Sequence, residues 1–145
     1  MKKFKLTSEF IVDISGVKLF RIKALIEFGN VKAGDLGGYI EKEENLSHMG
    51  DAWVSDDARI SGDAQVFGDA RVSGDKDYAY AHGFGSCNRT TTFFRLKDGD
   101  VGVRCGCFYG TLAQFRDKVC ETHGETKKAQ EYLMLADLME IRFKN

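Results

Sequence analysis

Residues 50–75 read GDAWVS, DDARIS, GDAQVF, GDARVS and GD, a six-residue repeat that governs how this chain folds. Each full copy carries an alanine two places before a branched aliphatic residue, at Ala52, Ala58, Ala64 and Ala70 before Val54, Ile60, Val66 and Val72. A unit this short cannot bury an apolar face by itself, so successive copies must stack and share one core. The pattern therefore predicts a short parallel β-helix, or β-solenoid.

Alternation within each copy predicts which side chains face the core. An Ala-x-Val trio is a short strand that points both of its small residues inward. The intervening side chains are expected to point outward: Trp53, Arg59, Gln65 and Arg71. Three copies would close a coil of roughly 18 residues, with neighbouring coils about 4.8 Å apart. Trp53 then lies beside Arg71, and Val54 lies beside Val72.

The repeat frame can be extended toward the N-terminus, where it becomes irregular. Ile40 and Leu46 fall on alanine positions of the frame, and His48 falls on an aliphatic position. We therefore expect an irregular first coil from about Leu36. His48 is expected at the end of that coil, where a polar ring can reach solvent.

Three segments are expected along the chain: a cap at 1–35, the β-solenoid at 36–84 and a ββαα module at 85–145. Apolar residues alternate on both sides of Ser15-Gly16, which predicts an N-terminal β-hairpin that caps the open coil. A second hairpin is expected around the turn at 97–100. The fold class predicted from these segments is α+β.

Two helices should follow the second hairpin. Thr111 and Gln114 have the spacing of a capping box, so a helix is expected to begin there and to run to about Cys120. Gly124 supplies a stop signal, and Thr126 is suited to cap the start of the next helix.

Composition bounds the class of protein. The chain has 145 residues, 43% of them hydrophobic, which is enough for the core of one domain or two small ones. Its opening, MKKFK, meets Glu9 and Asp13 before any sustained apolar run, so we expect neither a signal peptide nor a membrane span. The expected location is the cytoplasm, where the four cysteines would be reduced thiols.

Charge is unevenly distributed although the net charge is −1. Residues 1–40 carry 7 basic and 4 acidic side chains, residues 41–77 carry 4 and 10, and residues 78–145 carry 10 and 8. The three blocks therefore amount to +3, −6 and +2. An acidic midsection could attract a basic groove on a partner, although Asp at these corners also serves as ordinary turn chemistry.

Four stretches in a fixed order resemble a set of uncharacterised phage and prophage β-solenoid proteins. They are GDLGGYIEKEENLS at 34–47, the GDA repeats, FGSCNRTTTFFR at 84–95 and CGCFYGTLAQF at 105–115. The resemblance covers nearly the whole chain and implies a phage context. Small accessory proteins of phages include inhibitors of host defence systems, so the resemblance also implies that kind of role.

The sequence supports a binding role better than it supports any catalytic or metal site. The repeat resembles that of hexapeptide acyltransferases, but the regular run is short and no histidine lies within it. Cys105-x-Cys107 places two thiols on one strand face, a spacing that suits a buried core better than zinc. Cys107 or Cys120 with His123 could form a nucleophile pair, but the sequence has no oxyanion-hole signature. We predict no catalytic residue, metal or cofactor.

The stretch 88–95 interleaves two arginines and two phenylalanines with hydroxyl side chains, as nucleic-acid-binding strands can. Because the net charge provides no electrostatic funnel, we expect an amphipathic strand and no direct nucleic-acid binding.

The predicted function is a phage-encoded, non-enzymatic binding protein that inhibits a host defence system by occlusion. An anti-CRISPR-type inhibitor, which presents acidic surface to the basic groove of an effector nuclease, fits the charge pattern best. The expected partner-binding residues are Asp51, Trp53, Asp57, Asp63, Phe67, Asp69, Asp75, Arg89, Arg95 and Tyr109. A self-assembling structural solenoid and a degenerate acyltransferase are the alternatives, and homo-oligomerisation stays open.

Overall fold

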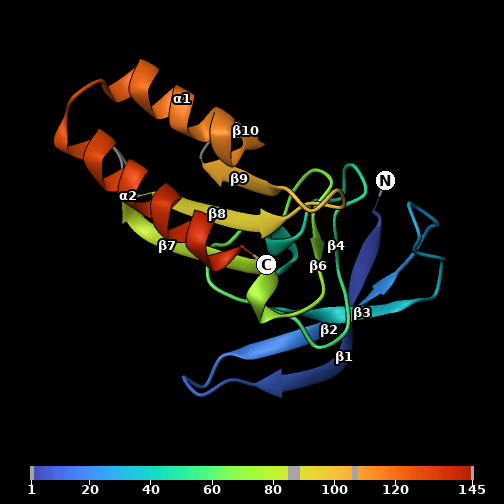
Figure 1. Cartoon of the computed structure of the whole chain (residues 1–145). Helices are drawn as coiled ribbons and strands as arrows, with labels where there is room; N and C mark the ends of the chain where they lie inside the picture. Colours follow the sequence, from blue (N-terminus) through green and yellow to red (C-terminus); the bar gives the residue numbers. More distant parts are fainter. Residues whose placement is uncertain (1, 85–88, 106–107, 145) are drawn as a thin grey trace.

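A computed structural model describes residues 2–84, 89–105 and 108–144, apart from the side chains of Asp75 and Arg89 (Figure 1). The strands are β1 (Phe4–Val12), β2 (Lys18–Ala24), β3 (Leu36–Ile40), β4 (Trp53–Val54), β5 (Arg59–Ile60), β6 (Arg71–Val72), β7 (Tyr78–Phe84), β8 (Arg89–Arg95), β9 (Val101–Cys105) and β10 (Phe108–Thr111). The helices are the short 3-10 turns η1 (Glu43–Asn45) and η2 (Asp75–Asp77) and the α-helices α1 (Leu112–His123) and α2 (Lys127–Arg142).

The N-terminal hairpin predicted from alternation is present as β1 and β2, which pair antiparallel. Its turn is closed by Asp13, whose carboxylate accepts hydrogen bonds from the backbone N–H groups of Ser15 and Val17 and from the Ser15 hydroxyl. The hairpin belongs to a four-stranded sheet in the order β1-β2-β3-β5. Figure 1 shows its tip projecting from the body of the molecule.

The second sheet has the order β10-β9-β8-β7 and is antiparallel throughout. Both α-helices lie over one of its faces (Figure 1). The predicted capping box is confirmed, since the Thr111 hydroxyl accepts from the Gln114 N–H and the Gln114 side chain accepts from the Thr111 N–H. Thr126 caps α2 in the same way through the Ala129 N–H. No helix in the described ranges is long and apolar enough to cross a membrane.

The prediction of a parallel β-helix is wrong. Strands in the repeat are only two residues long, and the described sheets neither close nor stack into a coil. Antiparallel partners flank the parallel pairs, with β2 beside β3 and a bridge between Ala70 and Leu96 beyond β6, so parallel stacking does not propagate. The solenoid and acyltransferase alternatives, which both need a β-helix, lose their structural basis.

Part of the predicted local pairing is nevertheless present. β4 and β6 pair parallel with Trp53 beside Arg71 and Val54 beside Val72, the predicted spacing of 18 residues. β3 and β5 instead pair with Ile40 beside Ile60, a spacing of 20. The prediction that Ile40 occupies an alanine position is therefore wrong. Leu46 is likewise displaced, because it bridges to Val66.

The eight small and aliphatic repeat positions are all fully buried, as the alternation predicts: Ala52, Val54, Ala58, Ile60, Ala64, Val66, Ala70 and Val72. They form one hydrophobic core with residues of β1, β2 and β3. A second core lies between the antiparallel sheet and the two α-helices. Phe94 belongs to the first core and its neighbour Phe93 to the second, so β8 is the wall between them.

The prediction that Trp53 points outward is also wrong, because this side chain is only 5% exposed. Its ring meets Phe28 edge-on at 5.3 Å, so the loop after β2 covers it. Alternation within a two-residue strand cannot anticipate a loop that arrives from elsewhere in the chain.

Two glycines with positive φ, Gly68 at a repeat corner and Gly16 in the β1–β2 turn, separate two reasons why glycine is required. Gly68 has a φ of +67° and lies against the Tyr109 hydroxyl, which a β-carbon would overlap. Gly16 has a φ of +88° but has no neighbour within 4 Å of the position of its missing β-carbon. We expect Gly16→Ala to cost about 1 kcal/mol of unfolding free energy, from backbone strain alone.

Gly68→Ala should cost about 2 to 4 kcal/mol, because overpacking against Tyr109 adds to the backbone strain. Urea unfolding of both variants measures the difference. Equal losses in the two variants would show that the contact between Gly68 and Tyr109 is not tight in solution.

Candidate functional site

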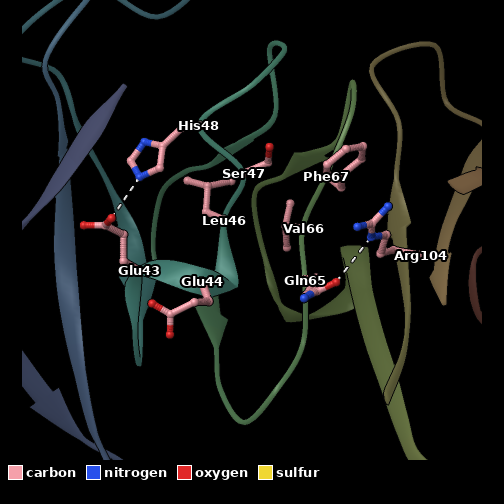
Figure 2. A pocket seen from close by; sticks show the side chains of 9 residues that line it. All are labelled: Glu43, Glu44, Leu46, Ser47, His48, Gln65, Val66, Phe67 and Arg104. Atoms are coloured by element: carbon pink, nitrogen blue, oxygen red, sulfur yellow. Dashed lines mark hydrogen bonds and ion pairs between the residues drawn. The ribbon is translucent and has the colours of Figure 1, made fainter. Parts of the chain in front are cut away.

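An open cleft of about 270 Å³ lies between η1 with the residues that follow it and the repeat residues 65–67 with β9. Nine residues line it: Glu43, Glu44, Leu46, Ser47, His48, Gln65, Val66, Phe67 and Arg104. Figure 2 shows an acidic wall with His48 on one side and a wall with Arg104 on the other. We refer to it as the Glu43–Arg104 cleft.

The acidic wall is built around His48. Its Nδ1 accepts a hydrogen bond of 3.0 Å from the backbone N–H of Lys3, and its ring stacks on Phe4 at 4.2 Å. Because Nδ1 is an acceptor, the proton of the neutral ring is on Nε2. Nε2 lies 3.3 Å from Glu43 Oε2, as the dashed line in Figure 2 marks.

Glu43 also pairs with Lys2, at 3.2 Å between Oε1 and the ammonium nitrogen. The hydrogen bond from Lys2 lowers the pKa of the Glu43 carboxyl. Desolvation opposes this shift, and the neighbouring His48 ring adds to it. Glu43 is therefore an anion at neutral pH, held between an ammonium and an imidazole.

Asn45 fixes the backbone below this wall. Its buried amide group donates to the carbonyls of Gly62 and Ala64 and accepts from the N–H groups of Glu41 and Lys42. All four hydrogen-bonding capacities of the side chain are thus used. The turn η1 is consequently held against the repeat, which sets the distance across the cleft.

Arg104 and Phe67 dominate the opposite wall. The Arg104 guanidinium lies 4.5 Å from the centre of the Phe67 ring, and its Nε donates to Gln65 Oε1 at 3.3 Å. Phe67 in turn meets Tyr109 edge-on at 5.0 Å. The Tyr109 hydroxyl accepts from the Asp69 N–H at 3.4 Å. Cation–π and aromatic contacts therefore hold the side chains of this wall in place.

Hydrogen bonding limits what the neutral His48 ring can do in this cleft. The Nδ1 lone pair of His48 is engaged by a backbone amide, and Nε2 carries a proton, so the neutral ring offers no free lone pair to act as a base. The cleft instead presents carboxylates on one side and a guanidinium over an aromatic ring on the other. Those groups can orient a polar ligand or a partner's side chains.

Four of the predicted partner residues gather beside this cleft. Phe67 and Tyr109 form its aromatic rim, and Asp51 and Asp69 lie near it on either side of Lys97, at 4.0 Å and 3.8 Å from the ammonium. The structure therefore unites aromatic and acidic residues that are up to 58 positions apart in the sequence.

The other predicted residues lie elsewhere. Asp57 approaches Arg21 at 3.5 Å, and Asp63 pairs with Lys42. Both carboxylates therefore have a cationic neighbour within the chain. Arg95 lies beside Asp77, at 3.6 Å. The side chains of Asp75 and Arg89 are outside the described part of the structure.

Sequence reasoning missed Arg104, Gln65 and the pair of Glu43 and His48 as a site. Arg104 did carry a signal, since it is the outward-facing charge between two apolar positions of a strand. His48 was the polar exception in the repeat frame. Neither signal says that the two walls face each other, because that depends on how β8 joins the two sheets.

Thiols form no site in the described ranges. Cys105 is buried, where its sulfur lies 3.3 Å from the Thr91 hydroxyl and 3.7 Å from that of Tyr132. Cys120 is exposed, and Cys87 and Cys107 lie outside the described residues. Among those that are described, no three His, Cys, Asp or Glu side chains are grouped to hold a metal ion.

No protein-family model matches the chain, and no curated protein matches it.

The backbone N–H of Lys3 donates to His48, and the pH dependence of stability tests whether the Lys3 side chain is buried beside this wall. Lys3 is buried, and its ammonium donates to the carbonyls of Gly50 and Ala52. Burial lowers the pKa of Lys3 from 10.5 to about 8, with Asp51 opposing the shift and Arg71 adding to it. Between those values the unfolded chain binds a proton that the folded chain lacks, so stability should rise with pH.

We expect the free energy of unfolding of the wild type, relative to Lys3→Met, to increase between pH 8 and pH 10 by at most about 1.4 kcal/mol per unit. Urea unfolding of both proteins at each pH gives this difference, and ionisation of tyrosines and cysteines cancels between them. A difference that stays constant or falls would contradict the buried position of the ammonium.

Proposed function

We propose that this chain is a non-enzymatic binding protein that acts by covering part of a partner protein, with the Glu43–Arg104 cleft and its aromatic rim as the contact surface. The observation that carries the proposal is the group of Phe67, Tyr109 and Arg104 at the edge of an open cleft. Tyrosine and arginine are enriched among the residues that dominate the binding energy of protein interfaces.

Preorganisation supports this choice of surface. Phe67 packs against the first core, and the Tyr109 ring is held by Phe67 and lies against Gly68. Such side chains lose little conformational freedom on binding, so more of the contact energy is available for affinity. Exposed Met49 lies one residue from His48 and would add adaptable apolar contact.

The partner class rests on the sequence resemblance to phage proteins described above. We propose a host defence protein in the cytoplasm of the infected cell, in particular a nucleic-acid-guided nuclease of the CRISPR type. The carboxylates of Glu43 and Glu44 at the cleft, with Asp51 and Asp69 beside it, give this surface groups that can face a basic nucleic-acid groove.

Tyr109 and Tyr80 form a matched pair for the test. They are 37% and 39% exposed, and each places its hydroxyl near a glycine of a repeat corner, Gly68 or Gly62. Only Tyr109 belongs to the aromatic rim. Tyr109→Ala and Tyr80→Ala should therefore lose similar folding stability but differ in partner binding.

The assay is survival of a reporter plasmid in bacteria that express a CRISPR nuclease directed at it. Expression of the wild type should protect the plasmid, Tyr80→Ala should protect it equally, and Tyr109→Ala should reduce protection by about tenfold or more, as loss of an interface anchor implies. Plasmid loss despite soluble wild-type protein, across a panel of such nucleases, would refute the partner class. Full protection by Tyr109→Ala would refute the surface.

A further inference from the structure

A second cleft, of about 660 Å³, lies among the C-terminal end of α2, η2, β6 and the turn between β8 and β9. Figure 1 shows the end of α2 beside η2 and β6. Six of its ten lining residues are cationic: Arg71, Lys76, Arg95, Lys97, Arg142 and Lys144. We call it the basic cleft.

Cations outnumber carboxylates six to one among the described residues that line this cleft. Asp77 is the one carboxylate among the described lining residues, and it is largely engaged, since it accepts from the Ser73 N–H and hydroxyl and lies 3.6 Å from Arg95. Within the described part of the chain, neither Lys76 nor Lys144 has an ion pair. Lys97 is also flanked by Asp69 and Asp51, at 3.8 Å and 4.0 Å, neither of which lines the cleft. With these two included, six cations face three carboxylates among the described residues, so positive charge remains in excess.

Positive charge also extends beneath the cleft. The Nε of Arg71 is buried and lacks a hydrogen-bond acceptor among the described residues, and buried Lys3 lies close enough for the two charges to interact. Holding like charges at low solvent exposure is unfavourable unless an anion is nearby. Asp51 is the carboxylate that interacts with Lys3, and its Oδ2 also lies 4.0 Å from Lys97 Nζ.

The lining favours phosphate groups over bases. Binding of single-stranded nucleic acid normally uses aromatic side chains on which bases stack. None of the described residues that line the basic cleft is aromatic, and Leu96 is the main apolar one. Its volume lies in the range of small-molecule sites, and Arg and Lys are the side chains that bind phosphate oxygens best.

We propose that the basic cleft is a binding site for a small soluble anion that carries two or more linked phosphate groups. Arg95, held by Asp77 and by the Gly99 carbonyl, is the fixed donor at its centre. Lys76 in η2 and Lys144 after the end of α2 supply further cations to the ligand. This site shares no lining residue with the Glu43–Arg104 cleft and does not depend on the proposed function.

Calorimetric titration of the full chain with sodium tripolyphosphate tests the proposal, in about 150 mM salt to suppress weak surface binding. Inorganic phosphate and an oligothymidylate are titrated in parallel. The double variant Lys76→Glu with Lys144→Glu replaces the two lysines of the cleft that form no ion pair with a described residue. Its matched control is Lys5→Glu with Lys127→Glu, which changes the net charge equally at exposed lysines outside the cleft.

We expect tripolyphosphate to bind more tightly than phosphate or the oligothymidylate, and the cleft variant to lose affinity by about tenfold or more while the control stays within about twofold. Absence of tripolyphosphate binding, or equal losses in both double variants, would overturn the proposal. Tighter binding of the oligothymidylate would replace it with a nucleic-acid site. Tyr109→Ala should bind tripolyphosphate normally, so the two proposals can fail separately.

Discussion

Strand β8 is the constraint on which the rest of this structure depends. Because successive side chains of a strand point to opposite faces, Phe93 is buried against the helices while Phe94 is buried against the repeat. Their two threonine neighbours are buried as well, and Thr92 accepts a hydrogen bond from the Gln65 N–H. One strand thus completes two cores that neither the repeat nor the helical half fills alone.

Both clefts inherit their geometry from this strand. Thr92 lies beside Arg104 in the sheet and holds Gln65, so it sets the wall on which Phe67 lies. Arg95, the last residue of β8, lines the basic cleft. A change that shifted β8 would therefore move both surfaces together, whereas substitutions at their rims leave the cores intact.

Local patterns in the sequence predict much of this fold. Alternation predicts both hairpins and the buried repeat positions, and the Thr111 capping box predicts the start of α1. These features depend on interactions between residues that are close together in the sequence, so the sequence alone can predict them. The β-helix was wrong because two-residue strands pair weakly, and antiparallel strands supply the remaining partners of the repeat. The displacement of Ile40 by two residues depends on the turn η1, which Asn45 ties to the repeat.

Charge was harder to predict than burial. The acidic block of residues 41–77 is real in the sequence, yet Arg21, Lys42 and Lys97, which come from other segments or from its edges, lie against its carboxylates. The excess cations gather instead around Arg95. Net charge along a chain therefore says little about the field at a surface, because folding brings distant segments together. The same reason hid Arg104 and His48, whose roles depend on contacts between segments.

The hairpin tip offers a practical consequence. Asp13 closes its turn with hydrogen bonds to residues within the tip itself, and the neighbouring Ile14 side chain is fully exposed. A fluorophore or spin label attached there would be displaced from both clefts and would leave the two cores unstrained. The rotational diffusion of the label would report the size of any complex that the chain forms, so the hairpin tip is a suitable position for measuring assembly in solution.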